Sequence, residues 1–133
     1  MPGCPMPRIL VVDDQPDVRA MISMLLRVNH FVVIEAENAA SALRAFETTP
    51  FDAVIVDIFL GSICGLDLIS AMRERAPELA VVAISGMATV DAVSRPSDLA
   101  DVVCLQKPFR PAELLRAISS AREAVSSRMV ASA

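Results

Sequence analysis

Five short runs of apolar, mostly β-branched residues recur along this chain, and the stretches between them are long enough for one helix each. The runs cover residues 9–12, 32–34, 53–56, 80–84 and 102–105. Each run is continuously apolar instead of alternating with polar residues, which is typical of strands buried on both faces, as in a parallel sheet. The runs therefore predict a parallel β-sheet with a layer of helices on each side.

The stretches between the runs carry the three-and-four spacing of amphipathic helices. We predict helices over residues 16–28, 39–46 and 65–75. Pro16 suits a first helical turn, where its missing N–H is not needed, and Asn38 is a suitable N-cap. A last helix is predicted from a single apolar stripe, formed by Leu114, Ile118, Ala121 and Val125.

The order of strand and helix, repeated five times, predicts an α/β fold, a doubly wound five-stranded parallel sheet with right-handed crossovers and helices on both faces. The 133 residues make about one domain. We place this domain at residues 8–126. Residues 1–7 and 127–133 are expected to be flexible tails, because they are small, polar or rich in proline.

Composition argues against several classes of function. With 12 Lys and Arg against 16 Asp and Glu, the net charge is −4, which disfavours binding to nucleic acid or to an anionic membrane. No apolar run approaches the roughly 20 residues that cross a bilayer, and residues 1–7 lack the pattern of a signal peptide, so we expect a cytoplasmic protein. Three scattered cysteines and one histidine do not provide the about four ligands of a structural zinc site.

Polar residues follow four of the five predicted strands at the point where each strand ends. They are Asp13 and Asp14, Asp57, Ser85 and Lys107. Because parallel strands bring their carboxyl ends to the edge where α/β proteins bind ligands, we expect these side chains to lie together. Three carboxylates would repel one another there unless they held a hard, oxygen-preferring divalent cation such as Mg²⁺.

The same edge contains the groups that phosphoryl transfer needs. A metal ion, Lys107 and the hydroxyl of Ser85 could neutralise the oxygens of a phosphoryl group. The carboxylate of Asp57 could attack phosphorus and form an acyl phosphate. The loop after the first strand has carboxylates in place of the glycines of a nucleotide-binding cradle, which disfavours dinucleotide binding.

These motifs resemble the receiver domain of two-component response regulators over about residues 8–126. The matching residues stand at strand ends in the family's order, namely Asp13-Asp14, Asp57, Ser85 and Lys107-Pro108-Phe109. The resemblance implies a flavodoxin-like sheet with strand order 2-1-3-4-5. It also implies that Asp57 accepts a phosphoryl group from a phosphohistidine on a sensor histidine kinase or a histidine phosphotransfer protein.

The resemblance further implies a Mg²⁺ site. Asp14 and Asp57 would bind Mg²⁺ directly, Asp13 would act largely through metal-bound water, and the backbone carbonyl of Phe59 would complete the protein's share of the ligands.

For the phosphorylated state, the resemblance implies that Ser85 hydrogen-bonds the phosphoryl group and moves toward it, and that Lys107 pairs with it. The bond between Lys107 and Pro108 would be cis, which a proline bond tolerates. The surface of the fourth helix, fifth strand and fifth helix would signal to a downstream protein or to an output domain that this chain lacks. The chain would be a signalling phosphoacceptor and not an enzyme, without direct contact to nucleic acid or membrane.

Three features depart from the family pattern. Cys104 stands where the family usually has Tyr or Phe, so we do not expect the usual aromatic switch. Leu60 and Gly61 replace a common Met-Pro pair, which predicts a more mobile loop after Asp57. Pro96 and the pair Ala100-Asp101, in place of Gly-Ala, predict a short or irregular fourth helix.

Two other functions stay open at this stage. One is a receiver-like interaction module that binds a partner without phosphorylation, which Cys104 and Pro96 motivate. The other is a Mg²⁺-dependent phosphohydrolase, but that chemistry usually has a second Asp two residues after the nucleophile, where this chain has Phe59.

Overall fold

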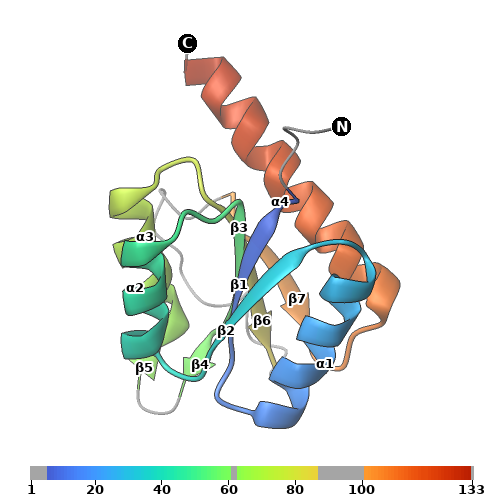
Figure 1. The fold of residues 1–133 in the computed structure, drawn as a ribbon. Coiled ribbons are helices and arrows are strands. Elements are labelled where there is room, and N and C mark those ends of the chain that lie inside the picture. Colours follow the sequence, from blue (N-terminus) through green and yellow to red (C-terminus); the bar gives the residue numbers. More distant parts are fainter. Residues whose placement is uncertain (1–5, 61–62, 87–100, 133) are drawn as a thin grey trace.

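The computed structural model describes residues 6–60, 63–86 and 101–132. The main sheet has five parallel strands in the order β2-β1-β3-β6-β7. Along the chain they are β1 (Arg8–Val12), β2 (Val32–Ala36), β3 (Ala53–Asp57), β6 (Ala80–Ser85) and β7 (Val103–Gln106). This is the predicted order 2-1-3-4-5, with β6 and β7 in the fourth and fifth places (Figure 1).

The four described helices are α1 (Pro16–Val28), α2 (Ala39–Thr48), α3 (Gly65–Arg75) and α4 (Pro111–Ser132). The limits of α1 and α3 are those predicted from the sequence. Asn38 is the N-cap of α2, as predicted, and its side chain accepts a hydrogen bond from the Ser41 amide at 2.8 Å. The helix expected after β6 falls in residues 87–100, outside the described residues. None of the described helices is both long and apolar enough to cross a membrane.

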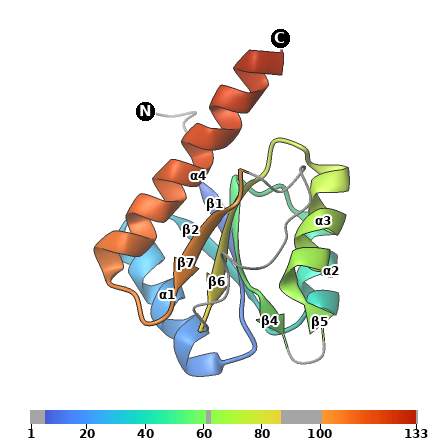
Figure 2. The ribbon, with the colours of Figure 1, turned by 180° about the vertical axis from the view of Figure 1, so that it is seen from behind.

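The last helix is longer than predicted. It continues to Ser132 and so includes residues 127–132, where we expected a flexible tail. Val125 is buried against the sheet, and the C-terminal part of the helix extends past the sheet (Figures 1 and 2). The boundary of the domain at residue 126 stays a prediction.

Alternate residues of each strand pack into two separate cores. On one face, Leu10, Val54 and Val81 pack with residues of α2 and α3. On the other face, Val11 and Ile55 pack with residues of α1 and α4. Figures 1 and 2 show these two helix layers on opposite sides of the sheet. Because both faces are covered, the central positions of β1, β3 and β6 are apolar, which explains the continuous runs in the sequence.

The start of β7 is tied to α3 by a buried ion pair. The guanidinium of Arg73, only 5% exposed, donates two hydrogen bonds to the carboxylate of Asp101, at 2.9 and 3.2 Å. Its Nε donates to the Leu79 carbonyl at 2.8 Å. A bidentate pair of this kind fixes direction as well as distance, so it holds the edge strand β7 in place beside β6.

The chain leaves β3 through a small antiparallel hairpin, β4 (Phe59–Leu60) with β5 (Ile63–Cys64), which the sequence analysis did not predict. Helix α3 then begins at Gly65, whose amide donates to the Ile58 carbonyl at 2.6 Å. A Cβ atom at Gly65 would lie 2.8 Å from the Ile58 Cα and still closer to the Asp57 carbonyl oxygen. The missing side chain therefore allows α3 to start directly against the backbone that carries Asp57.

We predict that Gly65→Ala destabilises the fold by about 1–3 kcal/mol, because the contact is with backbone that cannot move aside. The matched control is Gly86→Ala, where no described atom lies within 4 Å of the added Cβ. Urea unfolding of the two variants and the wild type measures the difference. Equal stability of Gly65→Ala and Gly86→Ala would show that α3 does not need this close approach.

Candidate functional site

Three carboxylates meet at the carboxyl edge of the sheet, as the sequence predicted. Oxygen atoms of Asp13, Asp14 and Asp57 all lie within 4.8 Å of one another. Asp13 follows β1 and is 1% exposed, while Asp57 ends β3 and is 5% exposed. Asp14 is exposed to solvent. Two buried carboxylates at this spacing require compensating positive charge.

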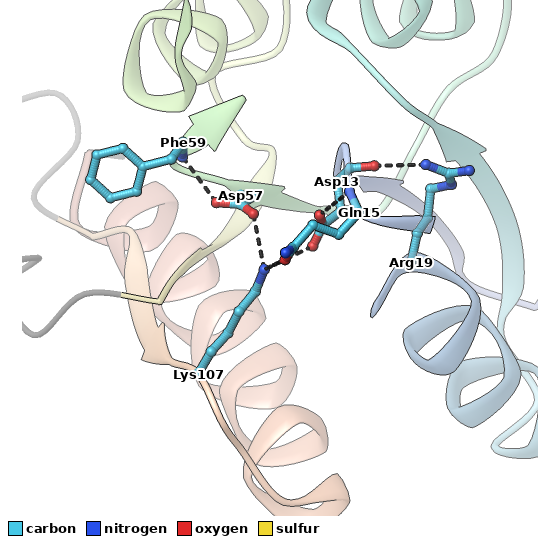
Figure 3. Close-up of polar contacts among 6 residues, drawn as sticks. All are labelled: Asp13, Gln15, Arg19, Asp57, Phe59 and Lys107. Atoms are coloured by element: carbon cyan, nitrogen blue, oxygen red, sulfur yellow. Dashed lines mark hydrogen bonds and ion pairs between the residues drawn. The ribbon is translucent and has the colours of Figure 1, made fainter. Parts of the chain in front are cut away.

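Lys107, the only lysine in the chain, supplies part of that charge. Its ammonium donates three hydrogen bonds, to Asp57 Oδ2 at 3.0 Å, to Asp13 Oδ2 at 3.2 Å and to Gln15 Oε1 at 2.9 Å (Figure 3). The ammonium is thus bonded to the ends of both β1 and β3. The sequence predicted the meeting of Lys107 with Asp13 and Asp57, but it did not predict Gln15.

The environment shifts the pKa values of two of these groups. Burial raises the pKa of Asp13, and the nearby charge of Asp57 adds to this effect. A hydrogen bond from the Gln15 amide and the charge of Lys107 oppose it without cancelling it. Burial alone would lower the pKa of Lys107, but the hydrogen bond to Asp57 and the charges of Asp13 and Asp57 raise it above its ordinary value. Lys107 is therefore a cation at neutral pH.

Backbone and side-chain contacts fix the two buried carboxylates. The Gln15 amide donates to Asp13 Oδ1 at 2.8 Å, and Arg19 Nη1 donates to the Asp13 carbonyl at 2.8 Å. Arg19 is held in turn by Glu35 of β2, at 3.1 Å. The Phe59 amide donates to Asp57 Oδ1 at 2.9 Å (Figure 3). Sequence reasoning missed Arg19. The signal was its place one helical turn after Gln15, which puts it at the start of α1, beside the end of β1.

The other predicted site residues lie at or next to this edge. Ser85 ends β6 and is fully buried, and its carbonyl accepts from the Lys107 amide at 2.7 Å. The bond between Lys107 and Pro108 is cis, as the family resemblance implied. The side chain of Phe59 is 47% exposed and points away from the carboxylates (Figure 3). Cys104, in β7, is half-buried against the core shared with α2 and α3.

This arrangement is suited to a divalent cation. The cluster has three carboxylates, and the Lys107 ammonium pairs with two of them, so negative charge is in excess. Oxygen atoms are also the ligands that Mg²⁺ prefers. One carboxylate, Asp57, also stands beside a cation that could contact a phosphoryl group bonded to it.

Comparison with known proteins points to one family. The family model for the response regulator receiver domain matches residues 9–119. The transcriptional regulatory protein PrrA of Mycobacterium leprae is 35% identical over 119 residues, which cover 89% of this chain and 51% of PrrA. The response regulator receiver protein CpdR of Brucella abortus is 32% identical over 114 residues, which cover 85% of this chain and 94% of CpdR.

Solved structures agree with this comparison. The response regulator protein TrrA of Thermotoga maritima, in complex with Mg²⁺ and BeF, has a TM-score of 0.77 and 26% identity, covering 87% of this chain and 99% of TrrA. The chain spans between 24% and 51% of the length of the first curated relatives that it matches.

We predict that Lys107→Met lowers the free energy of unfolding of the metal-free protein by about 3 kcal/mol at pH 7, because it leaves two buried carboxylates without their cation. Urea unfolding in the presence of a chelator measures the change. The control is Arg122→Met, exposed on α4, which should change stability by less than about 0.5 kcal/mol. A Lys107→Met protein as stable as the wild type would contradict this ionic account.

Proposed function

The chain belongs to the response regulator receiver domain family, which acts in two-component signal transduction, and on this basis we propose that it accepts a phosphoryl group on the carboxylate of Asp57. One observation carries the proposal: Asp57 Oδ2 is bonded to the ammonium of Lys107 at 3.0 Å, within a cluster of three carboxylates. A phosphoryl group on Asp57 would therefore lie beside both a fixed cation and a set of metal-binding oxygens.

The cation in this proposal is Mg²⁺. Asp14 and Asp57 would bind it directly, Asp13 would act through bound water, and the carbonyl of Phe59 would provide a further oxygen. The clustering of the three carboxylates supports this assignment, as does the Mg²⁺ complex of TrrA. When bound, Mg²⁺ supplies positive charge to the oxygens of the transferring phosphoryl group.

The residues of the chain would then act in one displacement step. A carboxylate oxygen of Asp57 forms a bond to phosphorus as the bond from phosphorus to the imidazole nitrogen of a phosphohistidine breaks. The electron pair of the broken bond stays on that nitrogen. Because the other ring nitrogen carries a proton, the histidine product is neutral. Lys107 would contact the phosphoryl oxygens, and so would the hydroxyl of Ser85. Ser85 is buried at the end of β6, and its hydroxyl would move toward the phosphoryl group, as the family resemblance implies.

We propose partners of the same kind as the family implies. The donor would be a sensor histidine kinase or a histidine phosphotransfer protein in the cytoplasm, and the receiver would comprise residues 8–126. The output surface would include β7 and α4 and would address a downstream protein or an output domain. Cys104, half-buried in β7, is too small for an aromatic swing, so the output would not use one. The chain would have no external substrate and would not be a classical enzyme.

Phosphorylation can be measured as intact mass after incubation with a small acyl phosphate donor. We expect a single phosphoryl adduct on the wild type that requires Mg²⁺ and is absent from Asp57→Asn. The matched control is Asp52→Asn, an exposed aspartate just before β3, at the opposite end of the strand that carries Asp57. This control should form the adduct as the wild type does.

Failure of the folded wild type to form an adduct, with acyl phosphate and with phosphohistidine donors alike, would overturn the proposal in favour of an interaction module that does not use phosphorylation. Turnover of small phosphomonoesters by the wild type, and not by Asp57→Asn, would instead point to a phosphohydrolase.

A further inference from the structure

All three hydrogens of the Lys107 ammonium are used in this structure. Two go to the carboxylates of Asp13 and Asp57 and the third to the neutral side-chain oxygen of Gln15, at 2.9 Å (Figure 3). An ammonium group has three donors, so Gln15 completes its set of partners. The Gln15 contact is also the shortest of the three.

Gln15 differs in kind from the other two acceptors. Asp13 and Asp57 belong to the carboxylate cluster that can hold a metal ion, whereas the side-chain amide of Gln15 carries no charge. A divalent cation partly neutralises the negative charge of its carboxylate ligands, so these ligands attract a neighbouring ammonium less strongly. A phosphoryl group on Asp57 takes up one of its oxygens as well. The oxygen of Gln15 is subject to neither change.

The backbone holds Gln15 in a position to do this. Its amide donates to Asp13 Oδ1 at 2.8 Å, and its carbonyl accepts from the Arg19 amide at 2.9 Å in the first turn of α1. The residue is thus attached both to the end of β1 and to the start of a helix. Its side chain is exposed, so water competes with it for Lys107, and its effect should be moderate.

We propose that Gln15 is a positioning residue for Lys107. It keeps the ammonium directed at the carboxyl edge of the sheet when Asp13 and Asp57 interact with Mg²⁺ and the phosphoryl group and attract the ammonium less. Without the Gln15 contact, the Lys107 ammonium spends more time in solvent and is less often beside Asp57 when the phosphoryl group is transferred. This inference rests on the proposed function, because it assigns Gln15 a part in the same phosphoryl transfer.

The substitution Gln15→Met tests the proposal, since it keeps the length of the side chain and removes the acceptor oxygen. We expect the rate of adduct formation with a small acyl phosphate to fall about threefold to tenfold at saturating Mg²⁺, the range for losing one ordinary hydrogen bond, because water competes for this exposed contact. The matched control is Gln106→Met, exposed at the end of β7. It should keep the rate of the wild type.

A second readout does not depend on activity. Lys107 is the only lysine, so protein labelled with ¹⁵N-lysine gives one ε-ammonium signal, whose proton exchange with water reports how firmly the group is held. In the presence of Mg²⁺, we expect exchange to be several-fold faster in Gln15→Met than in the wild type and Gln106→Met. Gln15→Glu, which keeps an acceptor oxygen, should retain slow exchange.

The outcomes separate the two claims. An unchanged rate and unchanged exchange in Gln15→Met, with normal adduct formation by the wild type, would overturn the role of Gln15 alone. Absence of an adduct from the wild type would overturn the proposed function, and the role of Gln15 in phosphoryl transfer with it.

Discussion

The ammonium of Lys107 is the interaction on which the geometry of the site depends. Asp13 and Asp57 are almost fully buried, and their negative charges would repel each other strongly without a cation between them. That cation comes from 94 residues further along the chain than Asp13 and 50 residues beyond Asp57. The ion pairs of Lys107 therefore form only when the four strands β1, β3, β6 and β7 are paired in the correct order.

Helix α3 contacts both the strand that carries Asp57 and the segment that leads into β7. Its first residue, Gly65, packs against the backbone of Asp57, and its last turn carries Arg73, which binds Asp101 just before β7. The edge strand β7 pairs only with β6 in the main sheet, so the contact with Asp101 and the bond from the Lys107 amide to the Ser85 carbonyl set its position. A change at the end of β6 would thus reach Lys107 directly through the backbone.

The sequence was sufficient to predict the parallel sheet and the meeting of Asp13, Asp57 and Lys107 at its edge, because both follow from periodicity, whereas the strand order and the cis bond before Pro108 were implied by the family resemblance. Strands buried on both faces leave polar residues only at their ends, and parallel strands bring those ends together. The contacts of Gln15 and Arg73 could not be predicted, because they depend on side-chain conformations between residues 92 and 28 positions apart. Strands of two residues, as in the β4–β5 hairpin, are too short to have a period. The helical course of residues 127–132 was not predicted because this short, mixed stretch shows no clear apolar spacing.

Metal-dependent unfolding tests most directly the central claim that Asp13, Asp14 and Asp57 form one divalent-cation site. Above the dissociation constant, the free energy of unfolding of the wild type should rise by about 1.4 kcal/mol for each tenfold increase in Mg²⁺. Asp14→Asn should need far more Mg²⁺ for the same gain, whereas Asp17→Asn, a matched change in the first turn of α1, should behave as the wild type. The account would be contradicted if the free energy of unfolding of the wild type did not change with Mg²⁺, or if Asp14→Asn gained stability at the same Mg²⁺ concentrations as the wild type.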